Sequence, residues 1–233
     1  MIEQVEIVAA YEVVAEQIRR SIYLGKYLVD SKLPPERIFA QQLGVSRTTL
    51  REALRILETQ GFLESHRGGS GGLIVHLPLE EPERVKRRLR EHMDIFEEML
   101  EFRLVIECAA SKFAASRRTE EDLIRLHRAF DGMHLAEGLP QFRTADHVFH
   151  LAIADAARNR SLQKAVQDAR ISMFTFVDVL PNSELMYLAQ RNDHSQILSA
   201  IQMASPQAAE DAMAAHIVRT RHQIHLTLGV EEQ

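Results

Sequence analysis

Asp146 and His150 stand four residues apart in the segment ADHVFH, inside a stretch with helical hydrophobic spacing. Four residues are slightly more than one helical turn, so the two side chains lie on one face of a helix. A carboxylate and an imidazole placed in this way can bind a metal ion, act as a catalytic acid and base, or lie on an exposed helix surface without a specific function. The pair alone leaves all three interpretations open.

Two further histidines stand among apolar residues in later segments. His194 lies in LAQRNDHSQILSAIQ, where Ile197, Leu198 and Ile201 mark the inward side, and His216 lies in AAEDAMAAHIVRT. One carboxylate and three imidazoles from three helices can converge inside a helical bundle and bind a metal ion. A single His on an apolar helix face is, however, commonly a hydrogen-bonded core residue. Spacing alone does not decide between these two interpretations.

Basic and hydroxyl residues crowd the start of another segment, VSRTTLREALRILETQG at 45–61. A recognition helix presents its N-terminal residues to base edges in the major groove of DNA. The guanidinium fork of Arg matches O6 and N7 of guanine. Each Arg alone fits a solvated helix start, but together with a glycine-rich turn they predict a DNA-binding surface. The predicted contact residues are Arg37, Ser46, Arg47, Thr48, Thr49, Arg51, Arg67, Gly68 and Gly69.

The first 78 residues contain the elements that would position this surface. Helices are predicted over 9–24, 34–44 and 45–61, and only a few residues around Gly44 separate the last two. A short glycine turn between two helices is the signature of a helix-turn-helix. FLES and LIVHL flank the turn RGGSGG and predict a two-stranded hairpin, which completes a winged helix. The residues expected to face its core are Val13, Val14, Ile18, Ile22, Ile38, Ala40 and Leu43.

The rest of the chain has a nearly continuous helical pattern. Helices are predicted over 81–93, 94–116, 119–135, 140–157, 160–179, 183–203 and 205–228, and no strand is predicted after Val75. Apolar faces of this kind are typical of an all-α bundle. The proline-containing stretch at 77–84, LPLEEPER, marks a boundary. We therefore predict a mainly α protein, with a winged helix-turn-helix DNA-binding domain at 1–78 and an all-α bundle of about seven helices at 79–233.

Composition sets limits on the class of protein. A hydrophobic fraction of 45% and a charged fraction of 26% are those of a soluble globular protein. No apolar run is long enough to span a membrane, and the single cysteine, Cys108, agrees with a reducing cytoplasm and is expected to be a core residue. The net charge of −5 arises after Pro78, because the first 78 residues hold nine basic and nine acidic residues. Charge therefore does not exclude a DNA partner.

The segment PPERIFAQQLGVSRTTLREALRILETQGFLESHRGG resembles the winged-helix domain of GntR-family transcription regulators. The Pro-Glu-Arg opening and the core VSRTTLREAL match the family pattern almost residue for residue, and the resemblance covers most of residues 9–76. It implies a homodimer that binds a palindromic operator in double-stranded DNA. Pro35 and Phe39, where Ser and Leu are usual, lie outside the DNA surface. The contacts that carry over are Arg37, Arg47, Thr49, Arg51 and the wing around Arg67–Gly69.

The later helices resemble the FCD-type ligand-binding domain of the FadR subfamily of these regulators. The matching motifs are DHVFH, DHSQIL, the later His216 and EFRLVIE at 101–107. The resemblance implies that Asp146, His150, His194 and His216 bind one divalent metal ion. Zn, Ni, Mn and Fe(II) all accept these ligands, and zinc is the ion expected to be found.

An effector is expected at the same place. Four protein ligands leave two positions of an octahedral ion, and a small carboxylate fits them. Arg103 would bind the other side of the acid through a bidentate pair. Arg143, one turn before Asp146, faces either this pocket or solvent. Asn159 is expected to cap the next helix, with effector binding as its second role.

Together these features predict a transcription regulator, a repressor whose operator affinity is controlled by a small carboxylate metabolite. The effector would change the separation of two winged helices in a dimer. One alternative is a metal-responsive regulator, in which the metal is structural or is itself the signal. Another is a metal-dependent enzyme, which is disfavoured because Glu107, the nearest base, can pair with Arg103. Catalysis would also leave the DNA-binding unit unexplained.

Overall fold

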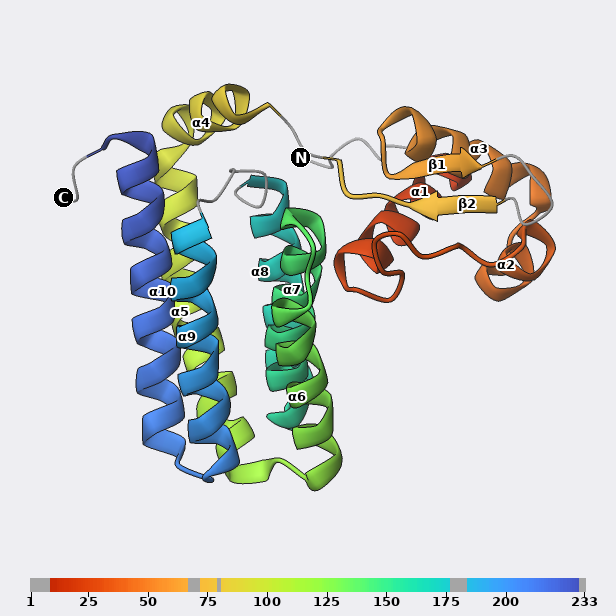
Figure 1. The fold of residues 1–233 in the computed structure, drawn as a ribbon. Helices are drawn as coiled ribbons and strands as arrows, with labels where there is room; N and C mark the ends of the chain where they lie inside the picture. Colours follow the sequence, from red (N-terminus) through yellow and green to blue (C-terminus); the bar gives the residue numbers. More distant parts are fainter. Residues whose placement is uncertain (1–8, 67–71, 79–80, 177–183, 231–233) are drawn as a thin grey trace, which may run out of the picture. The chain divides into compact units, whose positions relative to one another are not determined.

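The structure is a computed structural model that describes residues 9–66, 72–78, 81–176 and 184–230. The chain divides into two compact units, Met1–Pro78 and Leu79–Gln233. Each unit has its own set of secondary-structure elements, and each is described by itself below. The ribbon in Figure 1 labels these elements in chain order.

The N-terminal unit is a winged helix. Its helices are α1 (Ala10–Tyr23), α2 (Glu36–Leu43) and α3 (Arg47–Thr59), followed by strands β1 (Leu63–His66) and β2 (Gly72–Val75). The strands pair antiparallel, with Leu63 opposite Val75. Gly44 ends α2 at a φ of +68°, a left-handed conformation that glycine adopts without strain. Lys32 adds an isolated antiparallel bridge to Ile74, an element that the sequence did not predict.

The core of this unit corrects two sequence predictions. Val13 is 53% exposed, whereas Val14, Ile18 and Ile22 are buried as predicted. Ile38 is 41% exposed, and its neighbour Phe39 is buried instead. Adjacent helical residues point about 100° apart, and on α2 the side chain of Phe39 is the one that faces the core. The aromatic ring takes that place and packs edge-on against Tyr27, with ring centroids 5.6 Å apart.

The C-terminal unit contains seven helices in the residues that the structure describes, as predicted, and no strand is found among those residues after Val75. None of the described helices is both long and apolar enough to cross a membrane. The last three residues of the helix predicted over 160–179 lie outside the described residues. The helices are α4 (Pro82–Glu91), α5 (Met93–Arg117), α6 (Glu120–His134), α7 (Leu139–Ala156), α8 (Arg160–Phe176), α9 (Glu184–Gln202) and α10 (Pro206–Leu228).

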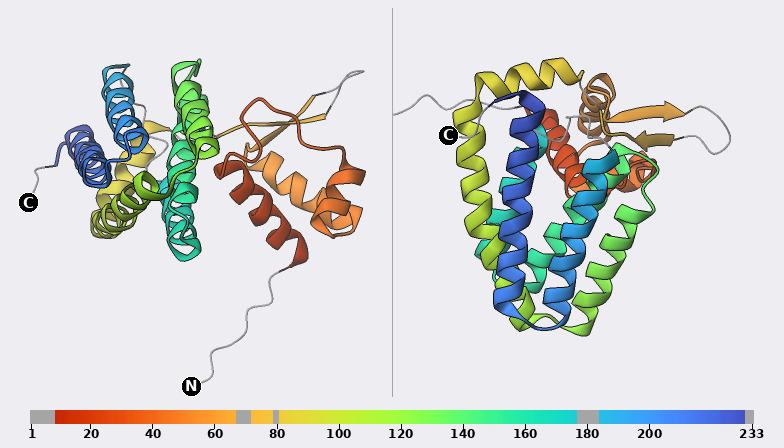
Figure 2. Two further views of the ribbon diagram at one scale, coloured as in Figure 1. Left: turned by 90° about the horizontal axis from the view of Figure 1, so that it is seen from below. Right: turned by 60° about the vertical axis from the view of Figure 1, so that its left-hand side comes forward.

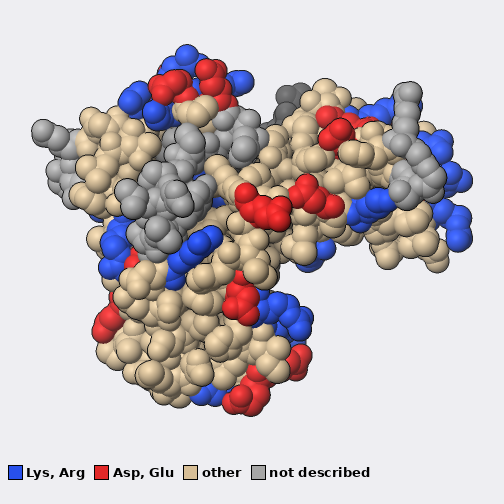
Figure 3. Space-filling view, in the orientation of Figure 1, with Lys and Arg blue, Asp and Glu red and all other residues tan. Residues whose placement is uncertain are grey.

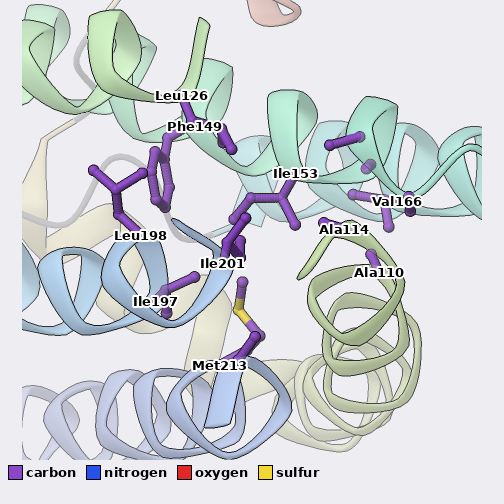
Figure 4. Packing of buried hydrophobic residues seen from close by; sticks show 14 of the residues in the cluster. Ala110, Ala114, Leu126, Phe149, Ile153, Val166, Ile197, Leu198, Ile201 and Met213 are labelled. Atoms are coloured by element: carbon purple, nitrogen blue, oxygen red, sulfur yellow. The ribbon is translucent and has the colours of Figure 1, made fainter. Parts of the chain in front are cut away.

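These helices form a bundle around one main core. The long helices α5, α9 and α10 lie side by side, and α6, α7 and α8 form a second group that packs against α5 (Figures 1 and 2). Phe149 and Ile153 of α7 meet Ile197 and Ile201 of α9 in the middle, as the close view in Figure 4 shows. Cys108 belongs to the same cluster, so its predicted core position is confirmed. A smaller cluster joins α4 to the ends of α5, α8 and α10.

A buried carboxylate fixes the start of α6. Asp122 accepts hydrogen bonds from the backbone N–H and the hydroxyl of Thr119, both at 2.9 Å, and pairs with Arg158 at 2.5 Å and with Arg125. Burial acts to raise the pKa of this carboxyl, but the bonds from Thr119 and the two guanidinium groups outweigh burial and lower the pKa. The capping contact therefore depends on the ionised carboxylate.

We expect Asp122→Asn to lower the free energy of unfolding at pH 7 by about 1–3 kcal/mol, since two guanidinium groups lose their charged partner. The folded pKa lies below the unfolded value of about 3.9, so this contribution is complete above that pH and is lost as the pH falls through the folded pKa. Urea unfolding at pH 7 and below pH 4 measures both effects. Asp131→Asn on the exposed side of the same helix is the control. Equal stability of the two variants at pH 7 would contradict the assignment.

Candidate functional site

Four side chains from three helices converge inside the C-terminal bundle. Asp146 and His150 come from α7, His194 from α9 and His216 from α10. Each offers one ligand atom, and these atoms all lie within 4.8 Å of one another. The sequence predicted this set, and the structure brings all four members together.

The contacts within this candidate metal-binding cluster (Asp146, His150, His194 and His216) are short. His194 Nε2 lies 2.9 Å from Asp146 Oδ1 and 3.2 Å from His150 Nε2. The ring centroid of His216 lies 4.5 Å from that of His194 and 5.3 Å from that of His150. All three rings are buried. Polar atoms gathered in this way without solvent need a shared partner or mutual hydrogen bonds.

The electrostatics keep two of the histidines, His194 and His216, available as ligands. Burial, reinforced by repulsion from His194, lowers the pKa of His216 to about 3. Burial is also the largest cause of the lowered pKa of His194, and it outweighs the opposing effect of Asp146. Both imidazoles are therefore neutral near pH 7 and have a lone pair for a metal ion. A divalent ion would not have to displace a proton from either ring.

Arg170 of α8 contacts this cluster, and the sequence did not predict it. Its guanidinium is buried and pairs with Asp146 Oδ2. Burial acts to raise the pKa of Asp146, but Arg170, His194 at 2.9 Å and His150 at 3.7 Å hold it well below its usual range. A signal was present, because Arg170 stands at helical spacing from Val166 and Met173, two buried residues of the same helix.

Two carboxylates support the outer nitrogens of the cluster. Glu107 Oε2 of α5 lies 2.6 Å from His150 Nδ1, and Asp193 Oδ2 lies 3.6 Å from His216 Nδ1. Arg219 in turn holds Asp193 through two contacts at 2.6 and 2.8 Å. Carboxylates behind metal-binding imidazoles fix the ring orientation and raise the basicity of the ligand. The donor set and its support fit a divalent transition-metal ion.

The three residues predicted to bind an effector have different surroundings. Arg103 is buried, and its Nε donates to Glu107 Oε1 at 2.6 Å, which confirms the predicted Arg103–Glu107 pair. Arg143 is also buried, so the solvent-facing alternative is wrong. Because Glu107 also contacts His150, it links Arg103 to the cluster.

Asn159 has a different role. Its amide oxygen accepts hydrogen bonds from the backbone N–H groups of Ser161 and Leu162, both at 3.1 Å, and the side chain is exposed at the start of α8. The predicted cap is therefore confirmed. Because the Asn159 side chain is exposed, it does not extend the buried cluster.

The predicted DNA-binding residues gather at the start of α3. Ser46 caps the helix, because its hydroxyl oxygen accepts a hydrogen bond from Thr49 N–H at 3.0 Å. Arg47, Thr48 and Arg51 are exposed on the first two turns, and Arg37 is exposed on α2. In Figure 3, Lys and Arg side chains gather over α2 and α3 of this unit. The predicted wing residues Arg67, Gly68 and Gly69 lie outside the described residues.

Both units match models of known families. Residues 10–72 match the model described as bacterial regulatory proteins, gntR family. Residues 98–219, more than half of the chain, match the FCD domain. The chain belongs to the GntR family. The FCD domain places it among the FadR-type members, so it is a DNA-binding transcription regulator with an effector-binding domain and not an enzyme.

Curated relatives of this GntR regulator agree with the assignment. The Exu regulon transcriptional regulator of Escherichia coli K12 is 32% identical over 225 residues, which cover 91% of this chain and 83% of the relative. The Glc operon transcriptional activator of the same organism is 27% identical over 224 residues, which cover 92% of this chain and 88% of the relative. The similarity therefore extends through both units.

Solved structures give the same fold. A GntR protein of Streptococcus agalactiae superposes with a TM-score of 0.50 at 25% identity, over 91% of this chain and 99% of that one. The E. coli protein McbR/YncC superposes with a TM-score of 0.53 at 17% identity, over 94% and 99% of the two chains. The winged helix followed by a helical bundle is thus the architecture of known regulators.

Proposed function

We propose that this GntR regulator is a homodimeric repressor whose affinity for a palindromic operator is controlled by a small carboxylate metabolite. The acid binds at a metal ion held by Asp146, His150, His194 and His216. One observation carries the proposal: these four donors, three of them buried, converge within 4.8 Å, and carboxylates lie behind two of the imidazoles. Since the partner is DNA, we also propose that the protein works in the cytoplasm.

The donor chemistry supports a metal ion, and zinc is the one we expect to be bound. Two of the imidazoles are kept neutral by burial, while Asp146 remains ionised beside Arg170. Imidazole nitrogens together with one anionic carboxylate oxygen suit Zn, Ni, Mn or Fe(II). When bound, such an ion supplies a Lewis-acidic centre with positions left for oxygen donors.

The surrounding arginines support an anionic effector. Arg103, Arg143 and Arg170 are all buried in the C-terminal unit, and a guanidinium group has five N–H donors, more than one paired carboxylate satisfies. Glu107 engages Nε of Arg103, so the terminal amino groups of Arg103 are the part that an acid would reach. Bidentate pairing of these groups with a carboxylate adds both affinity and orientation.

A regulator without an organic effector is the second candidate. The near-complete burial of the three imidazoles favours it, because metal sites closed to solvent are commonly structural or serve to sense the metal itself. In that case metal alone would change operator affinity, and no acid would add to the effect.

Arg103→Ala separates these two candidates. We expect small carboxylates from a screening panel to raise the thermal midpoint of the zinc-loaded wild type by several degrees, since a ligand at 100 times its Kd adds about 2.7 kcal/mol. Arg103→Ala should lose this increase but keep the increase caused by zinc alone. Differential scanning fluorimetry with zinc alone and with zinc plus each acid measures both.

Arg128→Ala is the control, because it removes a guanidinium from an exposed position on α6. If only Arg103→Ala loses the carboxylate response, the guanidinium binds the acid. If no acid stabilises the zinc-loaded wild type, the effector part of the proposal is wrong and the metal-only candidate stands.

Arg51→Ala tests the DNA surface. A duplex selected by the wild-type protein from a random-sequence library supplies the operator probe. We expect the variant to bind this duplex about 1–3 kcal/mol more weakly, because a bidentate contact to guanine is lost. Fluorescence anisotropy at fixed salt measures the change, and Arg20→Ala on α1 is the control for the loss of one positive charge. Equal binding by Arg51→Ala and wild type would remove Arg51 from the set of base contacts.

A further inference from the structure

Glu36, the first residue of α2, lies beside the two arginines at the start of α3. Its Oε2 accepts a hydrogen bond from Arg51 Nε at 2.8 Å and lies 3.7 Å from a terminal nitrogen of Arg47. Arg47 and Arg51 are four residues apart and share one helix face. A single carboxylate thus contacts two of the residues expected to recognise bases.

Stability does not account for this ion pair. The Arg51 side chain is 53% exposed and that of Glu36 is 39% exposed, and ion pairs at such positions contribute little to folding. Both residues line an open depression of about 770 Å³ between α2, α3 and the hairpin. The pair therefore stands at an open concave surface of the winged helix, where it can affect what binds there.

The contact restricts how Arg51 can be presented. Because Glu36 engages Nε, the edge formed by the two terminal amino groups is the one that remains for a ligand. That edge is a planar fork, which matches O6 and N7 of guanine. Holding a long side chain in one orientation before binding reduces the conformational entropy that binding would otherwise cost.

The same carboxylate also changes the charge of the surface. Affinity for any DNA sequence rises with the number of phosphates that the protein neutralises. Glu36 offsets one positive charge within 2.8 Å of Arg51, so it weakens attraction to phosphates without removing the guanine-binding fork. Orienting Arg51 therefore strengthens binding to the preferred sequence, whereas reducing the positive charge weakens binding to unrelated DNA.

We propose that Glu36 is a positioning residue that makes DNA binding sequence-selective: it orients Arg51 for guanine and suppresses binding to unrelated DNA. This inference rests on the proposed role of Arg51 in base recognition. Glu36→Gln, which keeps the size of the side chain, should therefore weaken binding to the preferred sequence and strengthen binding to other sequences.

The test compares wild type, Glu36→Gln, Arg51→Ala and Glu12→Gln as full chains. Each is used to select sequences from a random duplex library and is then titrated against the wild-type sequence and a scrambled duplex at several salt concentrations. We expect Glu36→Gln to bind the wild-type sequence ~3- to 10-fold more weakly and the scrambled duplex ~2- to 5-fold more tightly, with a salt slope steeper by up to about 1. Its selected sequences should lose the guanine preference that Arg51→Ala also loses.

The other variants distinguish a failure of the proposed role of Arg51 from a failure of the proposed role of Glu36. Glu12→Gln removes the same charge from exposed α1, so it should match wild type in both titrations. If Arg51→Ala keeps the wild-type sequence preference, the role of Arg51 is wrong and the inference falls with it. If Arg51→Ala loses the preference but Glu36→Gln keeps it, or binds both duplexes tighter by one factor, only the role of Glu36 is overturned.

Discussion

His194→Ala is expected to abolish stoichiometric metal binding. Wild type reconstituted with zinc and dialysed should retain about one ion per chain, and the variant should retain almost none. His194 is the fully buried member whose Nε2 lies 2.9 Å from Asp146 and 3.2 Å from His150. Even carboxylates behind metal ligands change affinity by about 10- to 100-fold when removed, so the loss of a direct ligand should exceed 100-fold. Metal analysis by mass spectrometry measures the content.

The same variant should lose the thermal stabilisation that zinc gives to wild type, because a ligand that no longer binds the folded state cannot stabilise it. His127→Ala, at an exposed position on α6, is the matched control and should keep both the metal and the stabilisation. Since His194→Ala also leaves a cavity, His194→Gln provides a second test with a side chain of similar size. One ion per chain in both His194 variants would show that the metal site is wrong.

Much of the fold follows from local signals in the sequence. Helix boundaries in the C-terminal unit agree with the predictions to within a few residues, because Pro206 and the cap residues Thr119 and Asn159 stand where helices begin. The four cluster residues were also accessible from the sequence, since Asp146 and His150 share a face and the other two stand on inward faces. The resemblance to the FCD-type domain then implied that these four residues bind one metal ion.

The interactions that could not be predicted from the sequence are those between residues that lie far apart along the chain. The spacing of Asp146 and His150 says nothing of Arg170, which reaches Asp146 from 24 positions later in the chain. The pair of Glu107 with His150 likewise depends on how α5 packs on α7. On α2, spacing could not decide between Ile38 and Phe39 for the core, because that choice depends on the ring of Tyr27 in a separate segment.

Phe149→Ala should be among the most destabilising single substitutions in the C-terminal unit. Phe149 is fully buried in the main core, where its ring lies edge-on to two imidazoles. Its ring centroid is 5.2 Å from that of His194 and 5.9 Å from that of His150. Truncating a buried Phe costs about 3–5 kcal/mol, through lost burial and the cavity left behind. A typical domain is stable by only about 5–15 kcal/mol, so the variant should unfold at a much lower urea concentration.

The contact of Phe149 with two of the proposed metal ligands, His150 and His194, adds a second effect. We expect the destabilisation to be larger in zinc-loaded protein than in protein kept with a chelator, because linkage adds the lost metal affinity to the lost packing. Phe102→Ala, which deletes the same atoms from a half-exposed position on α5, should cost less than about 1.5 kcal/mol in both states. If Phe149→Ala is equally destabilising with and without zinc, the ring supports only the core and does not help to position the metal ligands.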